Sequence, residues 1–153
     1  MQTLEAIQPG ISEHIVIMQQ ERGLVISLKD TLLFPKGSAT LTPQARQVVS
    51  GVGKSLSKLT NYVRVEGHTD NLPIHTAQFP SNWELSVLRA TNVAHLLINE
   101  DAVKPEKLSA IGYGEYRPLV PNTSKTNRAI NRRVDVVILK QKYDYFEPFP
   151  DQP

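Results

Sequence analysis

An acidic side chain and an arginine occupy positions from which they could together hold a small molecule carrying both an amine and a carboxylate. Asp70 ends the segment 67–70 (GHTD), directly after an apolar run. Arg89 stands seven residues after Asn82, which is about two helical turns, so these two should share one flank of a helix. A carboxylate accepts hydrogen bonds from an ammonium group, and the planar fork of an arginine donates two parallel bonds to a carboxylate.

The neighbouring pattern predicts the elements that would position these side chains. Residues 62–66 (YVRVE) alternate apolar and charged side chains, which predicts a strand with one buried face. After a loop over residues 71–80, Ser81 opens a helix, and Glu84 three residues later completes a capping box. The apolar stripe of that helix is predicted to be Trp83, Val87, Ala90, Ala94 and Leu97.

The N-terminal part of the chain favours a hairpin. Residues 14–19 and 24–28 are rich in β-branched side chains, and residues 21–23 (ERG) between them are typical of a turn. A helix over residues 11–20 is the alternative, because some of the same apolar residues also follow a helical spacing.

A loop over residues 29–39 is expected to lead into a second helix. Thr42 is a good N-cap, and Pro43 suits the first helical position. Gly51 and Gly53 should weaken this helix by about 1 kcal/mol each relative to alanine. Its apolar positions are Val48, Val49, Val52, Leu56 and Leu59.

The C-terminal part predicts two more strands. Residues 108–113 form a short strand ending in Gly-Tyr-Gly, residues 123–131 are polar with a helical middle, and residues 133–139 (RVDVVIL) are strongly β-branched. Residues 143–153 are predicted to be irregular or disordered. Strands that alternate with helices predict an α/β layered structure.

Composition excludes several function classes. The 153 residues suffice for one domain with a substantial core, and the absence of cysteine excludes disulfides and thiolate metal sites. A net charge of +2, from 17 basic and 15 acidic residues, is too balanced to predict a nucleic-acid partner. No apolar run approaches the ~20 residues that a membrane-spanning helix needs.

The sequence predicts neither a metal site nor a catalytic set. The four histidines are far apart, and none forms a pair with a carboxylate at the usual ligand spacing; they are His14, His68, His75 and His95. His68 is expected to be a structural hydrogen-bonding residue beneath the 71–80 loop. No nucleophile elbow, phosphate-binding loop or HExxH motif is present.

Simpler interpretations exist for each charged candidate. Asp70 could merely cap its own loop, and Arg89 could be a solvated helix residue. Arg128, Arg132 and Arg133 could form a solvated basic face, and for Arg128 we adopt that interpretation.

The motifs, taken in order, carry a family resemblance. With residues 112–115 (GYGE) and 131–135 (NRRVD), the GHTD segment and the helix that follows it closely resemble the OmpA-like peptidoglycan-binding domain over roughly residues 23–140. Residues 75–86 (HTAQFPSNWELS) are similar in particular to the flagellar motor stator B-subunits of the MotB type. The resemblance implies an OmpA-like α/β sandwich, a mixed β-sheet with helices packed on one face.

The resemblance also implies a ligand and a site. In this family the arginine that matches Arg89 grips the free carboxylate of diaminopimelate in the stem peptide of peptidoglycan, and Asp70 matches the ligand-binding acid. The full set of implied ligand-binding residues is Asp70, Arg89, Asn82, Leu85, Thr69, Ala90 and Arg132. No catalytic residue, metal or cofactor is implied, so we expect a protein that is not an enzyme.

The implied organisation has three parts. Residues 1–22 hold an N-terminal segment and the first hairpin strand, residues 23–140 the peptidoglycan-binding domain, and residues 141–153 an irregular tail. A stator subunit would also carry a membrane helix N-terminal to this chain, through which it would contact a MotA-type A-subunit. Peptidoglycan and a second copy of the chain are the other expected partners, on the extracytoplasmic side of the membrane.

Two alternatives remain open. An OmpA- or Pal-like envelope anchor unrelated to motility would share the domain, although the loop 72–83 argues for the stator branch. A cell-wall hydrolase would need paired carboxylates or a metal near Asp70, and the only acids nearby in the sequence are Glu66 and Glu84.

Overall fold

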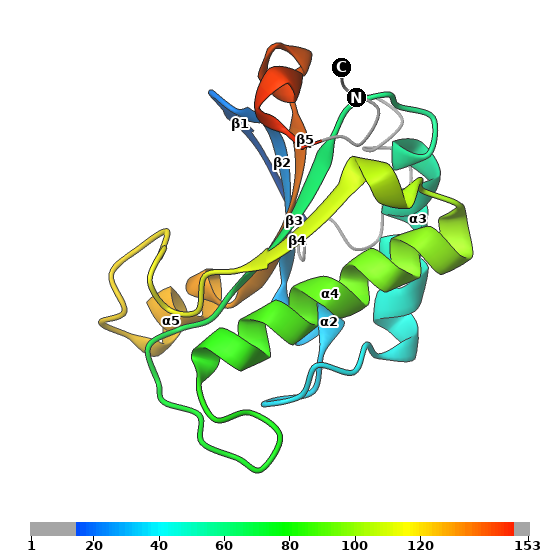
Figure 1. Ribbon diagram of the computed structural model, residues 1–153. Coiled ribbons are helices and arrows are strands. Elements are labelled where there is room, and N and C mark those ends of the chain that lie inside the picture. The colour runs from blue at the N-terminus through cyan, green and yellow to red at the C-terminus, as the bar shows by residue number, and fades with distance from the viewer. Residues whose placement is uncertain (1–14, 149–153) are drawn as a thin grey trace.

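A five-stranded mixed sheet forms the centre of the computed structural model, which describes residues 15–148 (Figure 1). The strand order is β1-β2-β5-β3-β4, and only the β3–β4 pair is parallel. The strands are β1 (Ile15–Gln20), β2 (Gly23–Lys29), β3 (Val63–His68), β4 (Leu108–Gly112) and β5 (Arg133–Leu139).

The two long helices pack on one face of this sheet (Figure 1). The helical elements are α2 (Asp30–Leu33), α3 (Pro43–Leu56), α4 (Asn82–Asp101) and α5 (Lys125–Asn131), with 3-10 turns η2 (Pro105–Lys107) and η3 (Gln141–Phe146). The predicted α/β sandwich with a mixed sheet and helices on one face is therefore confirmed. Within residues 15–148, no helix combines the length and apolar character needed to cross a membrane.

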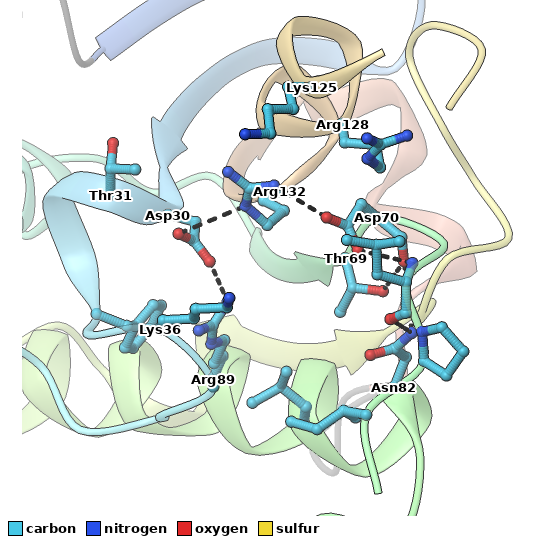
Figure 2. A pocket seen from close by; sticks show the side chains of 16 residues that line it. Asp30, Thr31, Lys36, Thr69, Asp70, Asn82, Arg89, Lys125, Arg128 and Arg132 are labelled. Atoms are coloured by element: carbon cyan, nitrogen blue, oxygen red, sulfur yellow. Dashed lines mark hydrogen bonds and ion pairs between the residues drawn. The ribbon is translucent and has the colours of Figure 1, made fainter. Parts of the chain in front are cut away.

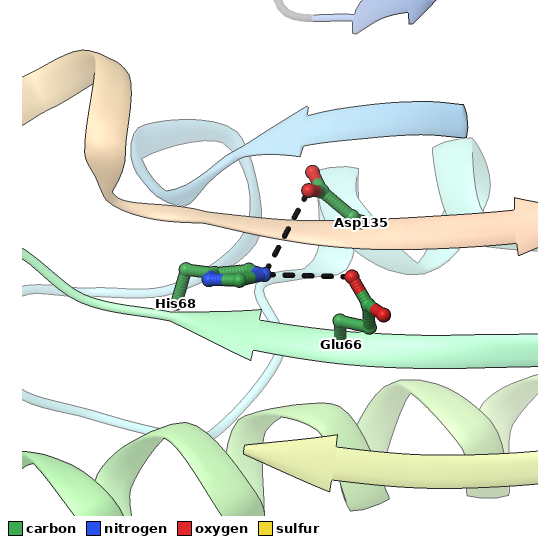
Figure 3. A group of neighbouring side chains, drawn as sticks. All are labelled: Glu66, His68 and Asp135. Atoms are coloured by element: carbon green, nitrogen blue, oxygen red, sulfur yellow. Dashed lines mark ion pairs between the residues drawn. The ribbon is translucent and has the colours of Figure 1, made fainter. Parts of the chain in front are cut away.

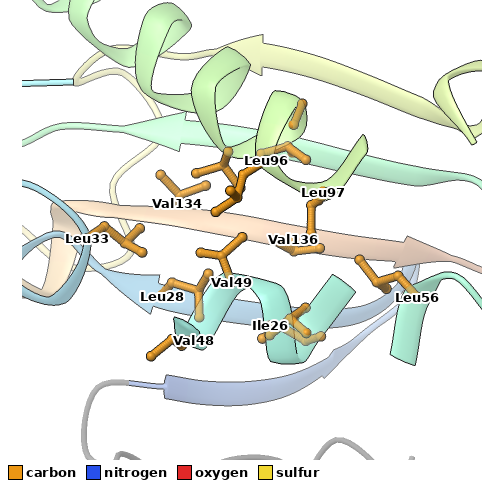
Figure 4. Close-up of a cluster of buried hydrophobic side chains, with 14 of the residues drawn as sticks. Ile26, Leu28, Leu33, Val48, Val49, Leu56, Leu96, Leu97, Val134 and Val136 are labelled. Atoms are coloured by element: carbon orange, nitrogen blue, oxygen red, sulfur yellow. The ribbon is translucent and has the colours of Figure 1, made fainter. Parts of the chain in front are cut away.

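The main core lies between the sheet and the two long helices (Figure 4). Leu28, Val134 and Val136 from the strands meet Val49 of α3 and Leu97 of α4, and all five are buried. Burying an aliphatic side chain of this size stabilises the fold by about 1.5–3 kcal/mol. This layer fixes where β3 and α4 lie relative to each other.

Local predictions for residues 15–59 hold with two exceptions. The hairpin of β1 and β2 is confirmed over residues 15–29, where the helical alternative is wrong, and His14 lies outside the described residues. Thr42 caps α3, because its hydroxyl accepts a hydrogen bond from the Ala45 amide at 3.0 Å. The predicted loop 29–39 instead contains the short helix α2, and Leu59 lies beyond α3 and is exposed.

The prediction that residues 62–66 have one buried face is wrong. Both faces of β3 are covered, and Glu66 is as deeply buried as the valines beside it. On the face opposite the helices, Val25, Val137 and Leu139 form a second apolar cluster with Tyr62. Charged residues share this face with the apolar cluster. The alternation of apolar and charged side chains along β3 therefore distinguishes two covered faces of the sheet, and not a buried face from a solvent-exposed one.

The apolar stripe predicted for α4 is only partly right. Ala90, Ala94 and Leu97 are buried, but Trp83 and Val87 are exposed. The inward side of the first turns of α4 is the one that carries Leu85 and Ser86. The helix is seated through backbone contacts instead. A Cβ added to Gly67 would lie 2.1 Å from the Ser86 carbonyl oxygen, and one added to Gly112 would lie 2.5 Å from the Val87 amide nitrogen.

The tail is more regular than predicted. Residues 141–146 form η3, and two of its side chains reach the tip of the first hairpin. Lys142 and Tyr143 contact the Glu21 carboxylate at 3.1 and 2.9 Å. Residues 149–153 lie outside the described part of the chain.

Candidate ligand-binding site

A cavity of about 610 Å³ opens where β2 and β3 end, beside the N-terminal half of α4 (Figure 2). The 29–39 and 71–80 segments and one side of α5 close it laterally. Its lining comprises Asp30, Thr31, Phe34, Lys36, Gly37, Thr69, Asp70, Leu72, Pro73, Ile74, Asn82, Leu85, Arg89, Lys125, Arg128 and Arg132.

Four charged residues of alternating sign cross the cavity wall, and we call them the cavity cluster (Figure 2). Arg89 Nη1 lies 2.5 Å from Asp30 Oδ2, and Asp30 Oδ1 lies 3.8 Å from Arg132 Nε. Arg132 Nη1 in turn lies 2.9 Å from Asp70 Oδ2. Each charge therefore meets an opposite charge, although the four residues come from four different segments of the chain.

Arg89 is held in the cavity wall rather than in solvent. Its side chain is only about 4% exposed, its Nε donates to the Ser38 carbonyl at 2.8 Å, and its guanidinium lies over the Phe34 ring. Burial lowers the pKa of Arg89, and the carboxylate of Asp30 opposes that shift. The interpretation of Arg89 as a solvated helix arginine is wrong.

Asp70 uses its two oxygens in different ways. Oδ1 accepts a hydrogen bond from the Leu72 amide at 2.9 Å, which is the local loop cap considered above. Oδ2 is the atom that faces Arg132. The capping interpretation is thus correct for one oxygen, while the other belongs to the cavity cluster.

Asn82 and Thr69 shape the backbone around Asp70. Asn82 Nδ2 lies 3.1 Å from the Leu72 carbonyl and 3.4 Å from the Asp70 carbonyl, so the first residue of α4 holds the loop. The Thr69 hydroxyl donates to the Asp70 carbonyl at 2.8 Å. Leu85 adds an apolar wall.

The cavity contains six of the seven predicted site residues. Ala90 is the exception, because it lies fully buried in the main core and takes no part in the lining. Whether the other six contact a ligand remains a prediction.

Sequence reasoning missed several lining residues. Arg128, assigned to a solvated face, lines the cavity together with Lys125 and Arg132. Their spacing of three and four residues puts them on one side of α5 and its C-cap, and this spacing could have indicated a shared surface. Asp30 directly follows the apolar strand β2, as Asp70 follows the end of β3, and this parallel could have revealed it.

The lining carries a positive balance. Among the described residues it includes five cationic and two acidic side chains, a net charge of +3. Because both acids are already paired with arginines, the unmatched charge comes from Lys36, Lys125 and Arg128. Such a site attracts a ligand with at least one carboxylate and retains two acids that can accept from an ammonium.

A second set of charges, which we call the sheet cluster, lies on the sheet face opposite the main core, where every member except Arg22 is buried (Figure 3). His68 Nε2 lies 3.6 Å from Glu66 Oε1 and 3.8 Å from Asp135 Oδ2. Arg22 binds Glu66 through two nitrogens, at 2.5 and 3.0 Å, and Arg133 Nε binds Asp135 at 3.0 Å. The cluster consists of Arg22, Glu66, His68, Arg133 and Asp135.

The sheet cluster corrects two predictions about His68. Its ring does have carboxylates nearby, because the β3–β5 register pairs Glu66 with Asp135, two residues far apart in the sequence. Within residues 15–148, neither ring nitrogen finds a partner at hydrogen-bond distance, and the ring instead stacks on Tyr113. A cation placed among these carboxylates would face two guanidinium groups, so the cluster is better described as a balanced set of ion pairs.

The sheet cluster also changes the pKa values of two of its members, Glu66 and Arg22. Burial would raise the pKa of Glu66, but His68 and the Arg22 guanidinium outweigh it and lower this pKa to about 2. Burial acts against the charge of Arg22 as well, yet Glu66 raises its pKa overall. The two residues therefore stabilise each other as a charged pair.

Comparison of the amino-acid sequence with known proteins identifies a matching family. Residues 33–132 match the model of the OmpA family. The chain is 41% identical over 122 residues to Motility protein B of Bacillus subtilis, covering 76% of this chain and 45% of that protein. It is 31% identical over 124 residues to outer membrane protein Omp38 of Acinetobacter baumannii, covering 80% of this chain and 34% of that protein. The chain thus spans about half the length, or less, of these curated relatives.

Solved structures of similar proteins share the fold of this chain. The periplasmic domain of Helicobacter pylori MotB superposes with a TM-score of 0.77 and 31% identity, covering 89% of this chain and 85% of that one. The cell wall anchor of the T6SS from Pseudomonas aeruginosa superposes with a TM-score of 0.80 and 30% identity, covering 90% and 95%.

Proposed function

The chain belongs to the OmpA family, and on this premise we propose that it binds peptidoglycan non-covalently through the cavity beside Asp70 and Arg89. The ligand group would be the free end of diaminopimelate in the stem peptide, which carries one carboxylate and one amine. The single observation that carries the proposal is the cavity cluster, because it offers both charge signs at one opening.

The carboxylate of the ligand would bind on the arginine side of the cluster. A guanidinium has five N–H groups. Arg89 uses the N–H of Nε for Ser38 and one N–H of Nη1 for Asp30, so three N–H groups of this lining residue are not engaged by these two bonds. Arg132, which is partly exposed, stands beside it and adds a second guanidinium.

The ammonium of the ligand would bind on the acid side. An ionised carboxylate has about four acceptor positions. Asp70 uses one on the Leu72 amide and one on Arg132, so positions remain for an ammonium, and Asp30 is similarly placed across Arg132.

We further infer that this domain anchors a flagellar motor stator to the cell wall. The support is the 41% identity to Motility protein B and the similarity to the periplasmic domain of MotB. In that role the domain would lie on the extracytoplasmic side, as a dimer, joined to the membrane by a helix that contacts a MotA-type subunit.

An envelope anchor unrelated to motility is the second candidate. The similarity to Omp38 and to the T6SS cell wall anchor favours it, because both share the fold at about 30% identity. The two candidates agree on the ligand and differ only in what the anchored molecule is.

A wall hydrolase has less support. Glu66 lies in the sheet cluster bound to Arg22, and Glu84 hydrogen-bonds the Ser81 hydroxyl at the start of α4. Neither acid is in the described lining of the cavity, and the two acids that are there are both paired with arginines.

Calorimetric titration with two stem tripeptides tests the ligand assignment. The tripeptide that ends in meso-diaminopimelate should bind, whereas the one that ends in lysine should not, since lysine lacks the distal carboxylate. Equal affinity for both would overturn the assignment to the carboxylate. Incubation with purified sacculi checks the hydrolase alternative, because release of soluble muropeptides would indicate an enzyme.

The stator role needs a test in cells. Full-length protein with Arg89→Ala should leave cells flagellated but poorly motile, and fluorescently tagged stators should remain at the motor for a shorter time. Unchanged residence time and swimming, with wall binding lost in vitro, would show that anchoring does not depend on this site.

A further inference from the structure

Two aromatic rings lie stacked on the surface at the start of α4, and we call them the aromatic pair. Trp83 is 47% exposed and Tyr116 is 61% exposed. Their ring centroids are 5.1 Å apart and their planes are inclined by 24°, which is an offset stack that leaves part of each ring face uncovered. Neither ring belongs to the main core, so core packing does not explain why an aromatic side chain is present at either position.

The aromatic pair is fixed in place by the backbone beneath it. Tyr116 follows a tight turn in which its amide donates to the Tyr113 carbonyl at 3.2 Å. In that turn the Gly114 amide donates to the Ser86 hydroxyl of α4 at 3.0 Å, and the Gly114 carbonyl accepts from the Thr69 amide at 2.9 Å. The segment carrying Tyr116 is thus tied both to α4 and to the end of β3.

The aromatic pair stands one residue along the chain from the rim of the cavity on both of its segments. Trp83 follows Asn82, a lining residue, and consecutive Cα atoms are only about 3.8 Å apart. Tyr116 follows Glu115, whose carboxylate lies 3.5 Å from Asn82 Nδ2. A molecule held in the cavity and extending past Asn82 would therefore meet the two rings next.

We propose that the aromatic pair stacks against an N-acetylhexosamine ring of the glycan strand whose stem peptide enters the cavity. This inference rests on the proposed function. Pyranose rings present faces made of C–H groups, which pack on aromatic faces, while their hydroxyl and amide groups remain in water. The pair offers matching properties, with uncovered ring faces and two polar tips, the indole N–H and the phenol hydroxyl.

The length of the ligand agrees with this placement. Diaminopimelate is the third residue of the stem peptide, so two residues lie between it and the sugar, and the three residues together span about 10 Å when extended. A sugar at that distance from the cavity falls within reach of residues that border Asn82. Beside the two rings, the half-exposed Val87 adds only a small apolar area. A protein partner would need a larger apolar surface than this, so a sugar ring is the better match in size.

Trp83 is the only tryptophan in the chain, so its fluorescence reports on this site alone. The probes are the tripeptide ending in meso-diaminopimelate, with and without its attached disaccharide. The disaccharide-tripeptide should shift or quench Trp83 emission and bind about three- to tenfold more tightly than the free tripeptide. The free tripeptide should bind with little change in emission.

Substitutions complete the test. Trp83→Ala and Tyr116→Ala should remove the advantage of the disaccharide and leave affinity for the free tripeptide unchanged, while Trp83→Phe should retain most of it. Val87→Ala, an exposed change one turn along the same helix, is the matched control and should have no effect. Equal affinity of both ligands for the wild type, or an equal loss of both in the variants, would overturn the inference.

The remaining outcomes separate this inference from the proposed function. If the free tripeptide fails to bind but the peptide-free disaccharide shifts Trp83 emission, sugar binding by the aromatic pair is supported. The assignment of the cavity to diaminopimelate is then wrong. If Trp83→Ala changes only the oligomeric state in sedimentation, the pair contacts a second copy of the chain, and the glycan assignment is wrong.

Discussion

The cavity cluster and the sheet cluster are built from the same kinds of side chain, yet they lie in opposite settings. Consecutive residues divide between them, because Arg132 faces Asp70 in the cavity and Arg133 faces Asp135 beneath the sheet. The Arg132 side chain is 31% exposed and lines the cavity, whereas the side chain of Arg133, the next residue, is 4% exposed and is not in the cavity lining. Both sets alternate acid and base, so composition does not distinguish them.

Position at the cavity, rather than exposure alone, separates the two roles. Asp30, Asp70 and Arg89 are only 4–10% exposed but line the cavity, whereas Arg22 of the sheet cluster is 34% exposed and is not part of that lining. A buried, balanced set of ion pairs contributes little net stability as a whole, but removing one member leaves an uncompensated buried charge. In the cavity cluster the same charges border an opening, so a ligand can join them. The sheet cluster should therefore govern folding and the cavity cluster should govern binding, and each prediction below tests that division.

The largest effect is expected from Asp135→Ala in the sheet cluster. It leaves Arg133 buried without its carboxylate, which should lower the free energy of unfolding by about 3–5 kcal/mol. Denaturant titration followed by circular dichroism measures this loss. Arg46→Ala is the control, because it breaks only an exposed pair with Glu100 and should cost about 0–1 kcal/mol. A similar small loss for Asp135→Ala would erase the distinction between the clusters.

Arg89→Ala in the cavity cluster should weaken binding of the diaminopimelate tripeptide by about 2–5 kcal/mol. Arg89→Lys should not restore full affinity, because an ammonium lacks the planar fork. Calorimetry measures the affinities, with Arg46→Ala again as the control. Circular dichroism must show that each variant is folded, since Asp30 loses its partner. Wild-type affinity in Arg89→Ala would refute the assignment.

Stability should fall in acid because of Glu66. Its pKa is about 2 in the folded protein and 4.5 in the reference state, so folding favours the ionised form. The corresponding stabilisation is fully present above pH 4.5 and is lost as the pH falls toward about 2, an effect of about 2–3 kcal/mol. Unfolding titrations between these pH values measure it. Glu66→Gln should be less stable at neutral pH and should show a shallower acid dependence, and an unchanged slope would argue against this origin.

The smallest effect is expected from Asp70→Asn, which keeps the shape and removes the charge. Binding of the tripeptide should weaken by about 1.5–3 kcal/mol, the range for hydrogen bonds to charged groups. The melting temperature should stay near that of the wild type, because the amide oxygen can still accept from Leu72. A large drop in melting temperature with unchanged binding would instead show that Asp70 stabilises the fold and does not contact the ligand.

The sequence predicted those features that depend on local chemistry. The β-branched run at 133–139 forms β5, Thr42 caps α3, and Ser81 caps α4, since each depends on residues close in the chain. The motif match also located Asp70 and Arg89, which the fold brings to one cavity.

Features that depend on strand register or helix rotation were not predictable in this way. Asp135 reaches His68 only because β5 pairs with β3, and Asp30 reaches Arg89 across 59 positions of sequence. Trp83 follows the helical spacing of a core residue, but the first turns of α4 bury the side that carries Leu85 and Ser86 instead. Periodicity gives the relative direction of side chains on one element, and it does not say which side of that element faces the neighbouring layer.

The bare backbone contact between α4 and the sheet determines how stiff the cavity is. At Gly67 the strand meets the backbone of Ser86 in α4 with no side chain between them, so no change of rotamer can widen or narrow the gap there. Asp70 and Arg89 are attached to these two elements, and the separation of their Cα atoms is therefore set by main-chain contact. A cavity of this kind loses little conformational entropy when it is filled, and it discriminates against a ligand that is one methylene too long or too short.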